Sequence, residues 1–446
     1  MKKFMVVLLV LSLTLSMVAC GNKETSQDND NQQNSNGNVD SSGDKEKDKI
    51  IEIDFWTMSL SPTFDDYING MIEAFEAEHS SIKVKWTDVP WGNMETKILT
   101  AVAGGSAPDV VNLNPQFAAK LATAGSLINP EAYMSEQEKD AYFKFIYESN
   151  AYQGNIFALP WYITNSITIY NTDLYEQAGA DVFTSYDDLI QVARKIKEET
   201  GKYAYFPSFD GTHLLETIAS KGIPLVKDGK AAFNTDDMKE MIELYTTLYK
   251  EKLIPTEILT GGHQKAREMY MSGDVATLIS GPTMLGPIKN DAPAIYDITD
   301  VEEAPTSAVG HHNAAIMNIA IPEQKDDTKY EAAAKFALFV TNAENQLAFC
   351  KVAGTILPAT KASLEDSYFK NDDQTIEGKA KMIAASQLEN SKALIPPMEK
   401  LSDLNDIMVD EVQKAMIGNQ SSDDAINNAL EGWNKVLEKV EHPIDF

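Results

Sequence analysis

The chain has 446 residues and a formal net charge of −29, with 67 acidic against 38 basic residues. Such an acidic surface repels nucleic acid and anionic lipid headgroups, so we expect no nucleic-acid partner. Two cysteines, Cys20 and Cys350, are too few for a disulfide framework, and the length from residue 50 onward allows two lobes with hydrophobic cores.

The N-terminal residues have the pattern of a secretory signal. Lys2 and Lys3 precede an apolar run over residues 4–18, which is followed closely by Cys20. A cysteine at this break resembles the lipobox of bacterial lipoproteins, although Met17 stands where that family prefers leucine. The resemblance implies cleavage before Cys20 and attachment of a fatty-acyl anchor, such as palmitate, through its thiol. A plain signal peptide and an uncleaved anchor are the alternatives.

Residues 21–49 are rich in Asn, Gln, Ser, Asp, Gly and Lys and nearly free of apolar side chains. They cannot bury enough surface to fold, so we expect a disordered tether. With Cys20 lipidated, Cys350 would have no disulfide partner. Its apolar helical surroundings predict a small buried hydrophobic residue.

From residue 50 the pattern alternates between strands and helices. Strands are predicted at 50–56, 82–86 and 108–113, and helices at 62–75 and 93–103. Pro62 is expected to open the first helix, and Gly104 and Gly105 to stop the second. Strand, helix and strand in alternation predict parallel pairing, with helices on the faces of the sheet.

The rest of the chain continues this α/β pattern. A hairpin is expected over 152–159, strands at 167–170, 275–279 and 314–321, and helices near 213–221, 236–251 and 264–272. Ser185 is expected to cap a helix with Asp188 three residues later. The last third is mostly helical, and the stripe of its final helix assigns Trp433 to the core.

Tryptophans and small polar residues gather where the predicted strands end. These segments are Trp56 to Ser59, Trp86 to Trp91, Asn112 to Gln116 and Trp161 to Asn165. In open α/β sheets, ligands bind at this edge. An indole covers the apolar face of a pyranose, and amides and carboxylates bond its hydroxyls, so these segments favour a carbohydrate.

The tryptophans differ in what their neighbours predict. For Trp56 and Trp86, a ligand contact and a core position remain equally open. Trp91 and Trp161 each follow a proline in an expected loop, which favours exposure.

Motifs for catalysis are lacking. The sequence has no His-Glu-x-x-His, no Gly-x-Ser-x-Gly, no phosphate-binding loop and no Cys-x-x-Cys. Adjacent residues of a strand point to opposite faces, so His311 and His312 would not share a metal ion. We therefore expect no enzyme activity, no cofactor and no metal. A glycosidase pair could still be hidden among the many acidic residues.

Five short motifs follow one another along the chain. They are Ala-Pro-Asp-Val-Val at 107–111, Tyr-Asn-Thr-Asp-Leu-Tyr at 170–175, Ser-Gly-Asp-Val-Ala-Thr at 272–277, Gly-Pro at 281–282 and Gly-Thr-Ile-Leu-Pro at 354–358. Their order and spacing resemble the extracellular solute-binding proteins of ABC sugar importers, the group that includes maltose-binding protein. The likeness extends over nearly the whole chain after the tether.

The resemblance implies a two-lobed α/β fold of the periplasmic-binding-protein type II, with the ligand in a cleft between the lobes. Three chain crossings would form the hinge, near 161–166, 314–318 and 358–361. On this basis we assign residues 50–161 and 317–358 to an N-terminal lobe, and residues 162–316 and 359–446 to a C-terminal lobe.

The ligand contacts that the resemblance implies lie at the strand ends, at the first crossing and in the second lobe. They are Trp56, Ser59, Asn112, Asn114, Trp161, Tyr162, Asn165, Asp210, His213, Thr283, His312 and Asn313, and the tryptophan pattern adds Trp91. Many relatives carry an aromatic stacking residue after Gly-Pro, where this chain has Thr283. Another residue, such as Phe209 or Tyr162, would have to supply that face.

Together these features predict a monomeric, lipid-anchored substrate-binding subunit of an ABC importer on the extracytoplasmic side of the cell membrane. It would capture a sugar or an oligosaccharide and deliver it to the permease, without performing chemistry and without binding nucleic acid. The alternatives are a surface-anchored glycosidase and a binding protein for a non-sugar solute, such as an oligopeptide or a ferric complex.

Overall fold

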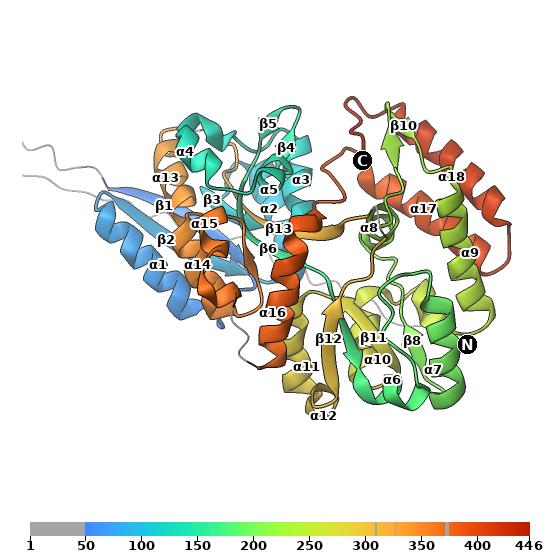
Figure 1. The fold of residues 1–446 in the computed structure, drawn as a ribbon. Coiled ribbons are helices and arrows are strands. Elements are labelled where there is room, and N and C mark those ends of the chain that lie inside the picture. The colour runs from blue at the N-terminus through green and yellow to red at the C-terminus, as the bar shows by residue number, and fades with distance from the viewer. Residues whose placement is uncertain (1–49, 308–309, 326, 371–373) are drawn as a thin grey trace, which may run out of the picture. The chain divides into compact units, whose positions relative to one another are not determined.

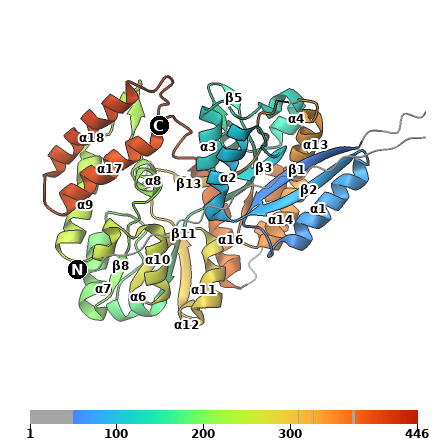
Figure 2. The same cartoon turned by 180° about the vertical axis from the view of Figure 1, so that it is seen from behind.

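The structure is a computed structural model that describes residues 50–307, 310–325, 327–370 and 374–446. The predictions for the signal, for Cys20 and for the tether lie outside these residues. The described residues from 50 onward form two lobes, each built around its own main sheet (Figures 1 and 2). We call the lobe around the larger sheet the first lobe and the other the second lobe.

The sheet of the first lobe has the strand order β14-β6-β13-β3-β1-β2, and β15 pairs with β13. β1 is parallel to β2 and to β3, as the alternation of strands and helices predicts. β13 is antiparallel to β3 and β6, so the sheet is mixed. The strands are β1 (Ile51–Met58), β2 (Ile82–Val89), β3 (Val110–Leu113), β6 (Leu159–Asn165), β13 (His312–Ala320), β14 (Leu357–Pro358) and β15 (Ser391–Lys392).

Helices cover both faces of this sheet because its strands are apolar on both sides. Val110 belongs to the large core, where Phe55 meets Phe336 edge to face at a ring distance of 5.0 Å. Val111 belongs to a smaller cluster with Met94, on the other face. The helices are α1 (Asp65–Glu78), α2 (Trp91–Gly104), α3 (Pro115–Thr123), α4 (Glu136–Asp140), α5 (Lys144–Glu148), α13 (Tyr330–Val340), α14 (Ala343–Ala353) and α15 (Lys361–Leu364).

The ends of these helices agree only in part with the predictions. Gly105 closes α2 in the left-handed conformation with φ of 67°, so the predicted glycine stop is confirmed. The prediction that Pro62 opens the first helix is wrong, because α1 begins at Asp65 and the preceding residues form a turn. The predicted hairpin is present as β4 (Ala151–Tyr152) and β5 (Asn155–Ile156).

The second lobe contains a four-stranded sheet among its described residues, in the order β12-β7-β11-β8. β11 is parallel to β8 and antiparallel to β7. The strands are β7 (Ile167–Asn171), β8 (Tyr203–Tyr205), β11 (Val275–Ser280) and β12 (Thr299–Glu303), with the separate pair β9 (Val226–Lys227) and β10 (Lys230–Ala231).

The helices of the second lobe follow the predicted pattern, with one correction. Ser185 does not cap a helix: α7 begins at Leu189, and the Ser185 hydroxyl accepts a hydrogen bond from the Asp187 N–H at 3.2 Å. Trp433 is fully buried in the last helix, as predicted. The helices are α6 (Thr172–Ala178), α7 (Leu189–Thr200), α8 (His213–Ser220), α9 (Asp236–Lys250), α10 (Gly262–Met271), α11 (Leu285–Asp291), α12 (Pro293–Tyr296), α17 (Leu401–Met416) and α18 (Ser422–Leu437).

Helix α16 (Ile376–Gln387) contacts strands of both sheets, β6 and β14 of the first and β7 and β12 of the second. Asn165, at the end of β6, donates its amide N–H to the Ala384 carbonyl at 2.7 Å. Gln387 donates to the Ser166 carbonyl at 2.9 Å and accepts from the Ala304 N–H at 2.8 Å. One helix therefore holds two of the segments that pass between the sheets.

Candidate functional site

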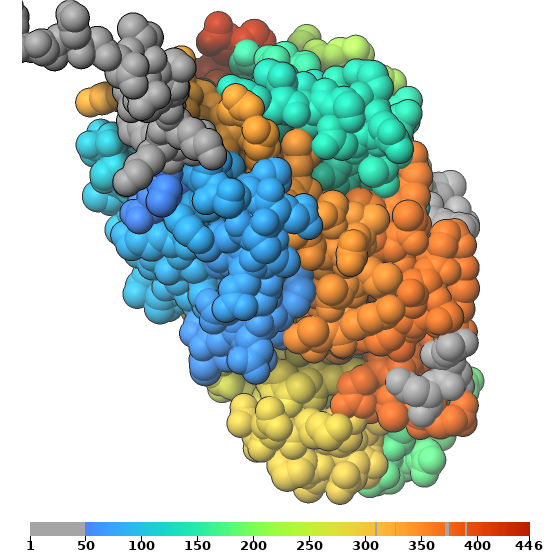
Figure 3. Space-filling view, turned by 90° about the vertical axis from the view of Figure 1, so that its left-hand side faces the viewer, coloured from blue at the N-terminus to red at the C-terminus, as the bar shows by residue number. Residues whose placement is uncertain are grey.

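A pocket lies between the two lobes, where β1 and β2 end. The first lobe contributes residues after β1, the start of α2, strands β6 and β13 and the end of α14, and the second lobe contributes the turn after β11. We call it the cleft pocket, lined by Met58, Ser59, Leu60, Phe64, Trp91, Tyr162, Thr164, Thr283, Gly286, Met317, Phe349, Ala353, Gly354, Thr355, Ile356 and Glu377. Figure 3 views the side where the blue segments of the first lobe and the yellow segments of the second lobe come near each other.

Ser59 fixes the first-lobe edge of the cleft pocket. Its φ is 54°, a left-handed conformation that is uncommon for a residue other than glycine. Its N–H donates to the Val89 carbonyl at 3.0 Å, and its hydroxyl accepts from the Trp91 N–H at 2.7 Å. The end of β1 is thereby tied to the start of α2. Trp91 is 51% exposed, so its predicted exposure is confirmed.

Strands β6 and β13 form a floor that continues beyond the cleft pocket. Tyr162 pairs with Met317 and Thr164 with Ala315, so these side chains share one face. Asn313 lies two residues before Ala315 and shares that face. Tyr162, Thr164 and Met317 line the cleft pocket, whereas Asn313 and Ala315 line a second pocket that includes Gln116, Phe157, Thr212, Glu216 and Leu401. We call this second space the adjoining pocket.

Glu377, in the first turn of α16, also lines the cleft pocket. Its Oε1 accepts hydrogen bonds from the Tyr296 hydroxyl at 2.6 Å and from the Lys289 ammonium at 3.1 Å. Burial alone would raise the pKa of Glu377, but these two hydrogen bonds lower it below its usual value. The side chain is therefore held in place as an ionised acceptor.

Glu216 occupies the corresponding position in the adjoining pocket. It lies in the first turn of α8, and its Oε1 accepts a hydrogen bond from the Thr212 hydroxyl at 2.6 Å. Its charge also helps to raise the pKa of His213. Glu216 and Asn313 line a third pocket as well, so that pocket opens from the same region.

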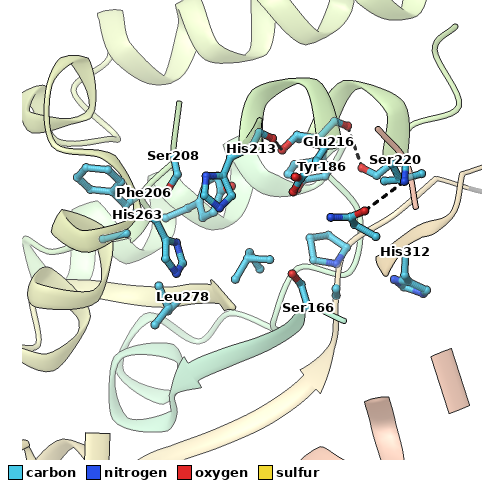
Figure 4. Close-up of a pocket in the computed structure, with 18 of the residues that line it drawn as sticks. Ser166, Tyr186, Phe206, Ser208, His213, Glu216, Ser220, His263, Leu278 and His312 are labelled. Atoms are coloured by element: carbon cyan, nitrogen blue, oxygen red, sulfur yellow. Dashed lines mark hydrogen bonds between the residues drawn. The ribbon is translucent and has the colours of Figure 1, made fainter. Parts of the chain in front are cut away.

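This third pocket lies in the second lobe beside two stacked histidines (Figure 4). The rings of His213 and His263 are 5.3 Å apart with an interplanar angle of 23°. Asp210 binds both residues, since one of its carboxylate oxygens lies 3.3 Å from His213 Nδ1 and accepts from the His263 N–H at 2.9 Å. We call it the histidine pocket, and its empty volume is about 700 Å³ with open solvent included.

The two stacked histidines differ in pKa and therefore in charge. The hydrogen bond from His213 lowers the pKa of Asp210 to about 2. Burial would lower the pKa of His213, but Asp210 and Glu216 raise it to about 9. Burial and the charge of His213 lower the pKa of His263 to about 4. At neutral pH, His213 is therefore charged and His263 is neutral.

The structure brings seven of the thirteen predicted site residues into these pockets. The cleft pocket receives Ser59, Trp91, Tyr162 and Thr283, and the histidine pocket receives His213, His312 and Asn313. Asp210 does not itself line the histidine pocket, but its carboxylate contacts His213, which does. Trp56 lines a separate hollow on the first lobe, where the Lys97 ammonium lies 4.1 Å from its ring.

The remaining four predicted site residues are buried, and the three asparagines among them are hydrogen-bonded within the protein. Trp161 is fully buried in β6 and stacks on Phe349 with ring centroids 4.8 Å apart, so its predicted exposure is wrong. Asn112 donates to the Asn318 carbonyl at 3.2 Å, and Asn114 caps α3 by accepting from the Phe117 N–H at 2.8 Å. Asn165 is committed to α16, as described above.

Neither Glu216 nor Glu377 is predicted as a site residue from the sequence. A carboxylate in so acidic a chain carries no signal of its own, and the partners of Glu377 lie 81 and 88 positions away in the sequence. Phe209, suggested as a stacking face, is buried against Tyr245 instead. Cys350 is fully buried, as predicted.

No group of three or more His, Cys, Asp and Glu side chains able to hold a metal ion occurs among the residues that the structure describes. Within those residues, no helix is both long enough and apolar enough to span a bilayer.

Comparison with known proteins gives consistent matches. The family model for bacterial extracellular solute-binding proteins matches residues 70–377. A solved structure described as a candidate oligosaccharide periplasmic-binding protein from Synechococcus sp. MITs9220, in complex with zinc, is 33% identical with a TM-score of 0.78 and covers 87% of this chain and 99% of that chain.

Two curated relatives match over most of their length. The sn-glycerol-3-phosphate-binding periplasmic protein of Shigella flexneri is 22% identical over 88% of this chain and 94% of its own. The galactooligosaccharide-binding protein of Bacillus subtilis is 23% identical over 77% of each chain.

Proposed function

Because this chain belongs to the bacterial extracellular solute-binding proteins, we propose that it is the substrate-binding subunit of an ABC importer and that its ligand is a sugar or an oligosaccharide. The ligand would bind in the cleft pocket and extend into the adjoining pocket. Contacts with both lobes would favour the closed form, which delivers the ligand to the permease.

The observation that carries this proposal is that Trp91 of the first lobe lines the same pocket as residues of the second lobe. An exposed indole at the end of β2 lines the same pocket as Thr283 and Gly286 of the second lobe and the carboxylate of Glu377. An aromatic face beside hydroxyl and carboxylate groups fits a pyranose, which has an apolar face and a rim of hydroxyls. The names of two relatives, the galactooligosaccharide-binding protein and the candidate oligosaccharide periplasmic-binding protein, support the same ligand class.

A role without catalysis fits the electrostatics of the cleft pocket. A glycosidase needs a general acid with a raised pKa, facing a second carboxylate across the sugar. The hydrogen bonds from Tyr296 and Lys289 shift the pKa of Glu377 in the opposite direction. Glu377 is thus suited to accept hydrogen bonds from a ligand and unsuited to protonate a leaving group.

The lobe division and the anchor are part of the proposal. We place the first two boundaries near residues 162 and 316, within β6 and β13. The third is better placed beyond Lys370, because Lys361 N–H donates to the Ala141 carbonyl and Ser363 to the Ala343 carbonyl, both in the first lobe. The lipobox at Cys20 would hold the protein, as a monomer, on the outer face of the cell membrane.

The test is a thermal-shift screen of the purified protein against mono- and oligosaccharides. A sugar at 100 times its dissociation constant should stabilise the folded protein by about 2.7 kcal/mol. A hit should be confirmed by calorimetric titration and should leave the sugar chemically unchanged. If no carbohydrate stabilises the protein while a peptide or a metal complex does, the proposed ligand class is wrong.

A further inference from the structure

A further set of contacts joins the two lobes at the adjoining pocket, apart from those of α16. Tyr152 lies on β4 of the first lobe and is buried in the smaller core cluster. Its hydroxyl donates a hydrogen bond to the Glu399 carboxylate at 3.2 Å. Glu399 lies between β15 and α17, and α17 packs against α8, α9 and α18 of the second lobe. This hydrogen bond therefore runs from one lobe to the other.

The neighbours of this hydrogen bond in the sequence line the adjoining pocket. On the first lobe, Asn150 and Phe157 flank the β4–β5 hairpin, and both side chains line that pocket. Pro397 and Leu401, each two residues from Glu399, line the same pocket. The hydrogen bond between the lobes therefore lies at the edge of a space in which the proposed ligand would bind.

The segment after α18 is fixed to the second lobe by its backbone. The backbone oxygen of Phe446 accepts hydrogen bonds from the N–H groups of Leu225 and Val226 at 2.7 and 3.0 Å. The Phe446 N–H donates in turn to the Val226 carbonyl at 3.1 Å. Pro443 lies against Gly229, where a Cβ atom would be only 3.1 Å from the proline ring. Residues 441–446 thus belong to the second lobe.

Ile444, within this segment, contacts the first lobe. Its half-buried side chain packs against the smaller core cluster, the one that contains Tyr152. Figure 1 marks the end of the segment beside α17, on the side that faces the first lobe. Burial raises the pKa of Tyr152, and the charges of Glu399 and Glu441 raise it further, so the hydroxyl keeps its proton and donates at neutral pH. The second lobe therefore meets this part of the first lobe with a carboxylate and with an apolar side chain.

Contacts of this kind favour the closed arrangement of the lobes without help from a ligand. A hydrogen bond to an ionised carboxylate is stronger than one between neutral groups. The side chain of Ile444 is removed from water by the first lobe only while the lobes are together. Because both contributions are lost when the lobes separate, a ligand has less of the closure to drive, and its apparent dissociation constant falls as the closed fraction rises.

We infer that Tyr152, Glu399 and Ile444 form an interlobe clasp, which holds the two lobes together at the adjoining pocket before any ligand binds. Helix α16 bonds the segments where the chain passes between the sheets, whereas the clasp joins residues 247 positions apart at the edge of a pocket. The clasp is a contact between the lobes themselves, so it acts whatever solute the protein collects.

The experiment compares the ligand-free protein with Tyr152→Phe, Glu399→Ala and Ile444→Ser by hydrogen–deuterium exchange and small-angle X-ray scattering. In each variant, exchange should become about tenfold faster at residues 150–158 of the first lobe and also at residues 395–401 beyond the hinge. This is the factor expected when a hydrogen bond to a charged group is lost from an opening equilibrium. The radius of gyration should increase, because the lobes separate more often.

A double variant tests whether Tyr152 and Glu399 act as a pair. Each single change removes the same hydrogen bond, so Tyr152→Phe combined with Glu399→Ala should exchange no faster than either change alone. Matched controls make the same kinds of change at exposed positions. They are Tyr133→Phe, Glu176→Ala and Ile417→Ser, and they should leave exchange at the clasp and the radius of gyration unchanged.

Two results would overturn the inference. If exchange rises only around the substituted residue, the contact is local packing and does not hold the lobes. If all three variants exchange and scatter as the unaltered protein does, the clasp does not exist. Melting curves check that each variant is folded, and Tyr152→Phe, which keeps its ring in the cluster, decides the case if another variant unfolds. No ligand is present, so neither result bears on the proposed function.

Discussion

Trp91 and Trp161 both follow a proline, and the structure gives them opposite surroundings. Trp91 is 51% exposed at the mouth of the cleft pocket, with its backbone N–H held by Ser59. Trp161 lies on β6, where it is fully buried and stacks on Phe349 of α14. An exposed indole is available to contact a ligand, whereas a buried indole contributes to the packing of the core.

Replacing each indole by alanine should separate binding from stability. Trp91→Ala should cost about 2 kcal/mol of sugar binding and leave the melting temperature nearly unchanged, because little packing is lost. Trp161→Ala should cost about 3–5 kcal/mol of folding stability. Titration calorimetry and thermal melts on both variants check this. Normal sugar binding by Trp91→Ala would place the ligand elsewhere.

The pair of Asp210 and His213 predicts a pH-dependent contribution to stability. The pKa of His213 is raised to about 9, so its contribution is complete below the unfolded value of about 6.5 and is lost as the pH rises through 9. The pKa of Asp210 is lowered to about 2, so its contribution is present above about 4 and is lost as the pH falls through 2.

His213→Gln should therefore lower the melting temperature at pH 6 and have a much smaller effect at pH 10. The measurement is the difference in melting temperature between the variant and the unaltered protein across this range. His442→Gln, near the C-terminus, is a control that should show no such trend. A difference for His213→Gln that stays constant from pH 6 to pH 10 would show that the ring does not carry the charge assigned to it.

The residues at the strand ends could be found from the sequence, but their burial could not. Ser59 and Thr283 lie in short connections after β1 and β11, Trp91 is the first residue of α2, and all three line the cleft pocket. Trp161 was misplaced because Pro160 suggested a loop. In the structure Pro160 lies in β6 opposite Asn318, next to an irregularity in the strand register, where a proline is tolerated.

Helix α16 is packed against both lobes and so connects them. It contacts strands of both sheets, and Gln387 near its end bonds the backbone at Ser166 and at Ala304. These two positions belong to different chain crossings between the sheets. A motion that separates the crossings would have to break or rearrange the hydrogen bonds of one buried amide.

Gln387→Ala should destabilise the protein by about 1–3 kcal/mol, because a buried N–H and a buried carbonyl lose their partner. Ser386→Ala, an exposed position one residue earlier on the same helix, should change stability by less than about 0.5 kcal/mol. Denaturant unfolding of both variants is the measurement. Equal stability in the two variants would mean that the hinge does not depend on this amide.

The order of strands and helices could be predicted because each type has its own apolar period. The three parallel strands and the helices from residue 213 to 272 were found in this way. The pairing of β13 with β3 and β6 could not be predicted, since it joins segments more than 140 residues apart. The role of α16 was missed for the same reason, because its partners are distant in sequence.

The proposed lipid anchor at Cys20 would determine where in the cell envelope the whole protein is located. Cys20→Ser should leave the protein unprocessed or release it from the membrane, because the thiol that would carry the lipid is absent. Incorporation of a labelled fatty acid and fractionation of cells are the measurements. Unchanged labelling in the variant would contradict the lipoprotein assignment, and Cys350→Ser is the control that should label normally.

The acidic chain and its cleft fit a member of an extracellular solute-binding family. A net charge of −29 keeps it from nucleic acid and from anionic lipid surfaces. Among the described residues that line the cleft pocket and the adjoining pocket, the charged side chains are the carboxylates Glu377 and Glu216. Selectivity would then depend on the fit of hydroxyl groups and on stacking against Trp91.

Intrinsic fluorescence tests the central claim most directly, since Trp91 alone among the five tryptophans lines the described part of the cleft pocket. A neutral oligosaccharide identified by the thermal screen should change the fluorescence in a saturable way. Trp91→Phe should lose most of that change while calorimetry still detects binding, because phenylalanine retains a stacking face. If the fluorescence change persists in Trp91→Phe, or if no oligosaccharide produces one, a sugar does not bind between the lobes at this residue.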